Sequence, residues 1–173
     1  SVAPIAKELA VPVEEAKKML RDLTAGVPAD LPDVADGIEF LQAVNLGKQV
    51  KVGRKVAVVG GGNTAIDCAR TAKRLGAQEV RVVYRRTRAE MPAAAEEIEA
   101  MLKEGIKIDY LTLPQKFFSK NGTLSEMECI RMQLGEPDAS GRRRPIPVAG
   151  SEFRAPVDTV IAALGQVTQV DYL

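Results

Sequence analysis

Apolar residues follow two different periods along the middle of this chain of 173 residues. Residues 55–59 form a nearly continuous apolar run, which is typical of a strand buried on both faces in a parallel sheet. Three glycines follow directly. After them, apolar residues recur every three positions, at Ile66, Ala69, Ala72 and Leu75. This spacing predicts a helix with one apolar face, and Gly76 is its expected stop.

A second strand and a second helix are predicted next. Residues 79–84 are again rich in apolar residues, and residues 92–105 begin with proline, carry glutamates early and end in glycine. That order suits a helix, because proline fits the first turn and acidic side chains are favourable near the positive end of the helix dipole. A third strand is expected over residues 106–111. The alternation of strands and helices with short connections predicts an α/β fold with a right-handed parallel sheet.

The helical period disappears after residue 113. Residues 120–123, Lys-Asn-Gly-Thr, lie between two apolar runs, and Asn-Gly in that setting is the strongest short signal for a β-hairpin. We expect residues 135–145 to form a polar loop, residues 148–153 to pair again, and residues 157–164 to form a final apolar strand. An antiparallel β-meander is therefore predicted beside the parallel sheet.

The N-terminal region has a different pattern. Residues 1–26 place apolar side chains every three or four positions, which predicts a helical segment or linker interrupted near Pro12. The stretch also resembles a helix-turn-helix. However, its acidic residues offset its lysines and no third helix supports it, so a packing or linker helix is favoured over DNA binding. Prolines punctuate residues 27–34, as at a domain boundary, and a short helix is expected over residues 37–44.

Composition excludes several kinds of chemistry. Hydrophobic residues make up 46% and charged residues 27% of the chain, as in ordinary globular domains. The absence of histidine excludes Ser/His/Asp and Cys/His catalysis, and two cysteines leave no complete ligand set for structural zinc or an iron–sulfur cluster. We expect Cys68 and Cys129 to be small buried apolar residues, and we predict no catalytic residue and no metal site in this chain.

The overall charge and hydropathy give no sign of a polyanionic or lipid partner. The net charge is +1, so no overall field attracts nucleic acid or an anionic membrane. The N-terminus lacks a basic stretch followed by an apolar run, and no apolar stretch approaches the roughly 18 residues that a transmembrane helix needs. We therefore expect a cytoplasmic protein with no nucleic-acid and no membrane partner.

The most informative motif is Gly-Gly-Gly-Asn-Thr-Ala at residues 60–65, a G-x-G-x-x-A arrangement between a predicted strand and a predicted helix. Gly60 can form the tight turn, Gly62 lets the backbone approach a pyrophosphate, and the small Ala65 lets the helix pack closely on the sheet. The amides at the start of the helix would face the phosphates. The residues predicted to bind the cofactor here are Gly60, Gly61, Gly62, Asn63 and Thr64. Simple capping of the helix is the alternative role for the last two.

The residues after the second strand indicate which dinucleotide is preferred. An NAD site normally has an acidic residue about 20 positions beyond the glycines, which accepts a hydrogen bond from the ribose 2′-hydroxyl. This chain has Arg85 and Arg86 there, and no acid between Val80 and Glu90. Guanidinium groups match the geometry of a phosphate, so these arginines predict binding of a 2′-phosphate and hence NADPH. A solvated arginine cluster is the alternative. For residues 142–144, three further arginines, an exposed hairpin loop is favoured over contact with a partner or phosphate.

Several separated segments together resemble one protein family. They are residues 58–67, 83–86, 91–93, 104–106 and 158–166. In this order they are similar to the NADPH-binding domain of glutamate synthase small (beta) subunits and related pyridine nucleotide-disulfide oxidoreductase-like flavoproteins, over about residues 27–169. The resemblance implies a Rossmann-like, three-layer α/β fold with a central parallel sheet plus an antiparallel β-meander.

The resemblance also implies a place within a larger flavoprotein. In that family the NADPH domain is inserted into an FAD domain, NADPH passes hydride to FAD, and electrons leave through iron–sulfur clusters toward a partner subunit. By resemblance, the glycine motif binds the pyrophosphate, Arg85 and Arg86 bind the 2′-phosphate, and Gly165 lies near the nicotinamide end or the crossing to the FAD domain. The FAD-binding glycine motif and the cluster cysteines of the family are missing. We therefore expect an excised NADPH-dependent oxidoreductase domain, inactive without its flavin, whose partners are the FAD domain of the parent chain and a large subunit or other electron acceptor.

Two other functions stay open at this point. One is a non-catalytic, nucleotide-sensing or DNA-linked regulatory module that uses the helices of residues 1–26. The other is an NADH-dependent member of the same family, in which the arginines after the second strand are only solvated.

Overall fold

The computed structural model of the chain describes residues 33–164. The predicted helical segment at residues 1–26 and the predicted site residue Gly165 lie outside the described residues. Within them, no helix is long and apolar enough to cross a membrane.

The centre of the molecule is a parallel sheet of five strands in the order β1-β9-β2-β3-β4. Its strands are β1 (Val34–Asp36), β2 (Lys55–Val59), β3 (Glu79–Val83), β4 (Lys107–Asp109) and β9 (Thr159–Ala162). The predicted strands are confirmed with ends that differ by a few residues. Strand β1 is new, because three residues beside a proline-rich stretch are too few to show a strand period. These residues form a strand because they pair in parallel with β9.

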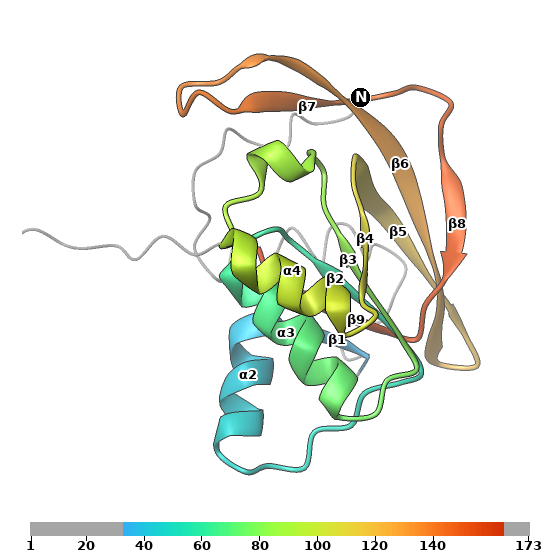
Figure 1. Cartoon of the computed structure of the whole chain (residues 1–173). Helices are drawn as coiled ribbons and strands as arrows, with labels where there is room; N and C mark the ends of the chain where they lie inside the picture. The colour runs from blue at the N-terminus through green and yellow to red at the C-terminus, as the bar shows by residue number, and fades with distance from the viewer. Residues whose placement is uncertain (1–32, 165–173) are drawn as a thin grey trace, which may run out of the picture.

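Three helices cover one face of this sheet (Figure 1). They are α2 (Gly37–Asn45), α3 (Asn63–Arg74) and α4 (Ala95–Lys103), and a short 3-10 turn, η1 (Arg88–Glu90), precedes α4. Helix α3 ends as predicted, with Gly76 at a φ of 104°. Large apolar side chains between the helices and the sheet are fully buried, among them Ile66, Ile98 and Met101.

The opposite face of the parallel sheet is covered by an antiparallel sheet. Its strands are β5 (Thr112–Lys120), β6 (Thr123–Pro137), β7 (Arg143–Pro147) and β8 (Phe153–Pro156). The predicted hairpin is confirmed: Asn121 and Gly122 have φ values of 54° and 77°, and β5 pairs with β6 on either side of them.

Two expectations about this sheet were wrong. The polar loop predicted over residues 135–145 is mostly strand, because β6 continues to Pro137 and β7 begins at Arg143; the two strands pair with each other, and only residues 138–142 form the turn. The strand expected over residues 148–153 starts only at Phe153, as β8. The two-stranded ribbon formed by the end of β6 and by β7 is largely exposed to solvent on both faces. Its polar side chains therefore show no apolar alternation from which the strands could be predicted.

Helices, parallel sheet and antiparallel sheet therefore form three layers, as predicted. A second buried cluster joins the two sheets. It includes Ala57, Val83 and Val160 of the parallel sheet and Phe117, Leu124 and Met127 of the antiparallel sheet. The long β6–β7 ribbon extends past this cluster and over the carboxyl edge of the parallel sheet, above η1 (Figure 1).

Candidate functional site

The turn of three glycines lies at the carboxyl edge of the parallel sheet, directly after β2. Gly60 has a φ of 144°, and a Cβ atom there would lie 2.2 Å from the carbonyl oxygen of Ala163. A Cβ at Gly61 would lie 2.4 Å from Cε2 of Tyr84. These two glycines are therefore required by packing, because the ends of β9 and β3 press against the turn.

Gly62 is different, because a Cβ atom there would meet nothing within 4 Å. It is the N-cap of α3, and no side chain caps this helix. The amides of Ala65 and Ile66 donate to the carbonyl oxygen of Gly62, whereas the amides of Asn63 and Thr64 have no acceptor among the described residues. The positive end of the helix thus faces open space with unpaired donors, which is the arrangement that binds an anion at a helix N-terminus.

The Asn63 side chain does not cap its own helix, which corrects one of the roles expected for it. Its Oδ1 accepts a hydrogen bond of 2.9 Å from the amide of Ala94, and the amide of Ala93 donates to the carbonyl oxygen of Gly61 at 3.2 Å. Residues 92–94, expected at the start of a helix, instead precede it and hold the start of α4 against the glycine turn. Helix α4 begins at Ala95 for this reason.

The end of β3 carries the predicted arginines. Arg85 is half-buried, but Arg86 is only 3% exposed. The Arg86 guanidinium donates to the carbonyl oxygen of Arg143 at 2.7 Å and forms an ion pair of 3.2 Å with Asp138. Sequence reasoning missed this contact, because Asp138 is 52 residues away in a segment that was expected to be a loop.

Arginines from two segments gather around Tyr84. Burial raises the pKa of this phenol, while the positive charges of Arg86, Arg142 and Arg85 act in the opposite direction. The Tyr84 hydroxyl donates to the carbonyl oxygen of Glu90 at 2.9 Å. Arg142, expected in an exposed loop, is half-buried, and its amide donates to the Asp138 carboxylate that pairs with Arg86. It therefore lies at the same edge of the sheet as the arginines after β3.

The first acidic residue after β3 is already engaged. The Glu90 carboxylate accepts hydrogen bonds from the amide and the hydroxyl of Thr87, which close a capping box around η1. The hydrogen bond from the Thr87 hydroxyl is the main cause that lowers the pKa of Glu90. Asp138, the other carboxylate at the end of β3, is paired with Arg86. Both acidic side chains that the described residues place there are therefore engaged within the protein.

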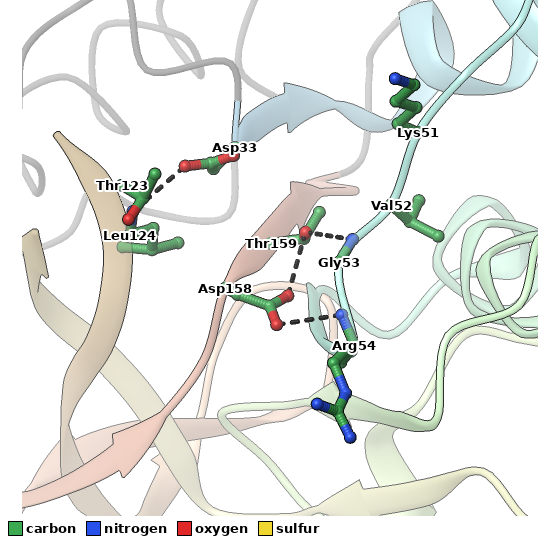
Figure 2. Close-up of a pocket in the computed structure, with 9 residues that line it drawn as sticks. All are labelled: Asp33, Lys51, Val52, Gly53, Arg54, Thr123, Leu124, Asp158 and Thr159. Carbon is green, nitrogen blue, oxygen red and sulfur yellow. Dashed lines mark hydrogen bonds between the residues drawn. The ribbon is translucent and has the colours of Figure 1, made fainter. Parts of the chain in front are cut away.

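A hollow of about 370 Å³ lies at the opposite, amino edge of the sheet (Figure 2). The Asp158 carboxylate there accepts from the backbone amides of Arg54 and Lys55. The Asp33 carboxylate accepts from the amide of Leu124 at 3.1 Å. Asp158 joins the beginnings of β9 and β2, and Asp33 joins the beginning of β1 to that of β6. Ligands of open parallel sheets bind at the carboxyl edge instead. The hollow is therefore not the site indicated by the glycine turn.

The two cysteines behave as expected. Both are free and buried, and burial raises the pKa of each thiol to about 12. The Cys68 thiol donates to the carbonyl oxygen of Gly37 beneath α2. Thiols held neutral in this way are packing residues.

The three layers and the open helix terminus after β2 define a Rossmann-like nucleotide-binding fold. The chain belongs to the pyridine nucleotide-disulphide oxidoreductase family, whose model matches residues 20–173. This finding agrees with the resemblance drawn from the sequence motifs.

Within this family, the chain is similar to subunits of several oxidoreductases. The chain is 49% identical over 138 residues to the NADP(+)-dependent formate dehydrogenase subunit beta of Moorella thermoacetica, covering 79% of this chain and 20% of that protein. It is equally similar to the NADPH-Fe(3+) oxidoreductase subunit beta of Geobacter sulfurreducens. It is 43% identical over 114 residues to the glutamate synthase [NADPH] small chain of Escherichia coli, covering 65% and 24% of the two chains. The chain spans about a fifth to a quarter of the length of these relatives.

Solved structures show the same fold at low identity. Mycobacterium tuberculosis FprA in complex with NADPH has a TM-score of 0.63 at 17% identity, over 95% of this chain and 49% of that one. Lactococcus lactis thioredoxin reductase has a TM-score of 0.54 at 16% identity, over 92% and 41%. These similarities confirm the predicted Rossmann-like architecture.

Proposed function

We propose that this chain is the NADPH-binding domain of an oxidoreductase similar to the glutamate synthase beta subunit. The observation that carries the proposal is the pairing of an open helix N-terminus at Gly62 with arginines at the end of β3, where the acidic side chains of Glu90 and Asp138 are engaged within the protein. The relatives, which include an NADP(+)-dependent formate dehydrogenase subunit and an NADPH-Fe(3+) oxidoreductase subunit, favour this function over a DNA-linked module.

Each part of the site would serve a different part of the cofactor. Gly60 and Gly61 shape the turn, and the space over Gly62 admits the pyrophosphate to the amides of Asn63 and Thr64. The arginines Arg85 and Arg86 provide the preference for a 2′-phosphate, either by touching it or by organising the groups that do. Gly165 lies outside the described residues, and the family resemblance implies a place near the nicotinamide end or the crossing to the FAD domain.

The bound NADPH would supply the hydride, and this chain would hold and orient it. No residue of the chain needs to act as an acid, base or nucleophile, because hydride transfer is the chemistry of the cofactor. We propose FAD, carried by another part of the parent protein, as the acceptor. Iron–sulfur clusters and a large subunit or other acceptor would take the electrons onward.

A calorimetric titration of the chain with NADPH and with NADH tests the proposal. We expect NADPH to bind at least tenfold more tightly than NADH. The Arg85→Ala substitution should lower the affinity for NADPH by about tenfold to a hundredfold, because a hydrogen-bonded charge pair contributes about 1.5–3 kcal/mol. NADH binding should stay unchanged.

Arg54→Ala provides the matched control. Arg54 is an exposed arginine at the amino edge, hydrogen bonded to Gln78, far from the glycine turn in the topology of the sheet. Its removal should alter neither affinity. Equal affinities of the unaltered chain for the two nucleotides would contradict the arginine argument, and absence of binding would contradict the function as a whole.

A further inference from the structure

The contacts of Arg86 are those of a residue that joins two segments. Its side chain is 3% exposed, and its guanidinium binds both ends of the turn at residues 138–142. It pairs with the carboxylate of Asp138, the first residue of the turn, and donates to the carbonyl oxygen of Arg143, the residue after it. A ligand in solvent would have little access to a group buried this deeply. We call this arrangement the Arg86 clasp.

Asp138 serves both the clasp and the turn. Its Oδ2 pairs with Arg86, while its Oδ1 accepts from the amide and hydroxyl of Ser140 and from the amide of Arg142. Its own amide donates to the carbonyl oxygen of Arg142 at 2.8 Å. One carboxylate therefore fixes the shape of the turn and its attachment to the end of β3.

The ribbon behind the turn is also tied down. The Arg143 guanidinium donates to the carbonyl oxygens of Leu134 and Gly135 across the β6–β7 pair. The Arg143 guanidinium is therefore held within the ribbon. Arg142 is half-buried at the tip, where its Nε donates to the Ser140 hydroxyl at 3.3 Å. Its backbone is held by Asp138, whose carboxylate pairs with Arg86, the neighbour of Arg85 in the sequence.

We propose that Arg86 is a positioning residue, which clasps the 138–142 turn onto the end of β3 so that Arg142 joins Arg85 in binding the 2′-phosphate. This inference rests on the proposed function and assigns the specificity of the site to two segments about 55 residues apart in the sequence. It makes the antiparallel meander part of the cofactor site.

The alternative is that Arg86 binds the 2′-phosphate directly, and the two roles predict opposite effects of one substitution. If Arg86 leaves its contacts to bind the phosphate itself, Asp138 competes with the ligand, and its removal frees a cation and deletes a negative charge. Asp138→Ala would then tighten NADPH binding. If Arg86 is a clasp, the same variant releases the turn and weakens NADPH binding although it makes the site more positive.

The experiment measures dissociation constants of the chain for NADPH and NADH with Asp138→Ala, Arg142→Ala and the control Arg144→Ala. We expect about a fivefold to tenfold loss of NADPH affinity in each of the first two variants and unchanged NADH affinity. Arg144→Ala removes an exposed arginine of the same ribbon and should change neither. If these residues only stabilised the fold, the substitutions would lower the affinities for NADPH and NADH equally. The ratio of the two dissociation constants therefore distinguishes the two roles.

Melting curves of each variant accompany the titrations. Should Asp138→Ala fail to fold, Arg142→Ala carries the test, because it leaves the ion pair between Arg86 and Asp138 in place. An unchanged NADPH to NADH ratio in Arg142→Ala, or tighter NADPH binding in Asp138→Ala, overturns the inference while the proposed function stands. Absence of binding by the unaltered chain overturns both.

Discussion

The three glycines in the turn after β2 are required for different physical reasons. Gly60 adopts a positive φ, and both it and Gly61 lie against atoms that a side chain would strike. Gly62 has an ordinary backbone conformation and faces open space. The first two are therefore constraints of folding, whereas the third is a constraint of binding, and the two kinds can be separated by substitution.

Alanine at positions 60 and 62 should separate stability from nucleotide binding. Gly60→Ala is expected to lower the free energy of unfolding by about 2 kcal/mol or more, because it combines an unfavourable φ with a collision at the Ala163 carbonyl. Gly62→Ala should leave the melting temperature nearly unchanged. It should lower the affinity for NADPH by about tenfold, because the added methyl group occupies the space over the helix terminus. Thermal melts and titrations of both variants measure this. A Gly62→Ala variant that binds normally would show that the pyrophosphate lies elsewhere.

The sequence predicted the glycine turn well and the arginines only in part. The G-x-G-x-x-A spacing is a local pattern, and its strand and helix are local too. The surroundings of Arg86 depend on Asp138, which comes near only because the β6–β7 ribbon folds back over β3. Nothing in the vicinity of Arg86 in the sequence indicates that partner, so its burial could not be foreseen.

At the scale of elements, α3 and α4 are joined by charged side chains at their exposed side. The Arg70 guanidinium pairs with Glu97 and Glu104, each at 2.8 Å. The hydrogen bond from Arg70 is the main cause that lowers the pKa of Glu104 below its ordinary value of 4.5. A carboxylate of this kind stabilises the fold above the unfolded-state pKa and loses that contribution as the pH falls through the folded-state pKa.

Glu104→Gln should therefore lower stability in a pH-dependent manner. At pH 7 we expect a fall in melting temperature of about 1–3 °C, since the pair is partly exposed to solvent. The gap should close as the pH falls below 4.5, where Glu104 of the unaltered chain becomes protonated. Glu99→Gln on the same helix is the control, because Glu99 is exposed and has no ion pair among the described residues. A gap that persists in acid would show that lost packing, not lost charge, is the cause.

The boundaries of elements could be predicted where local signals set them. The Asn-Gly hairpin and the Gly76 stop of α3 are such cases, since a positive φ favours these residues. Helix α4 starts later than Pro92 because the amides of Ala93 and Ala94 are taken by the glycine turn. Tertiary contacts there override the local preference for a helix.

At the scale of the molecule, the parallel sheet has one core on each face. Met127 of β6 is 1% exposed in the cluster that joins the two sheets. Residues of both sheets share this cluster, so the meander and the Rossmann-like half are expected to unfold together. That coupling matters for the site, because the meander carries the turn that the Arg86 clasp holds.

Met127→Ala should cost about 2–5 kcal/mol, as for other buried large-to-small substitutions. Unfolding followed by far-ultraviolet circular dichroism and by tyrosine fluorescence should remain a single coincident transition at a lower midpoint. Met127→Leu, which conserves volume, should cost less than about 1.5 kcal/mol. Two separate transitions would contradict a shared core between the sheets.

In the proposed complex, NADPH lies along the carboxyl edge of the parallel sheet, with its pyrophosphate at the glycine turn and its 2′-phosphate at the arginines. A crystal structure of the chain with NADPH would show whether the cofactor binds in this way. We expect pyrophosphate oxygens within hydrogen-bond distance of the amides of Asn63 and Thr64, and the 2′-phosphate beside Arg85. A nucleotide in the hollow lined by Asp33 and Asp158, or one whose 2′-phosphate points away from the end of β3, would contradict this proposal.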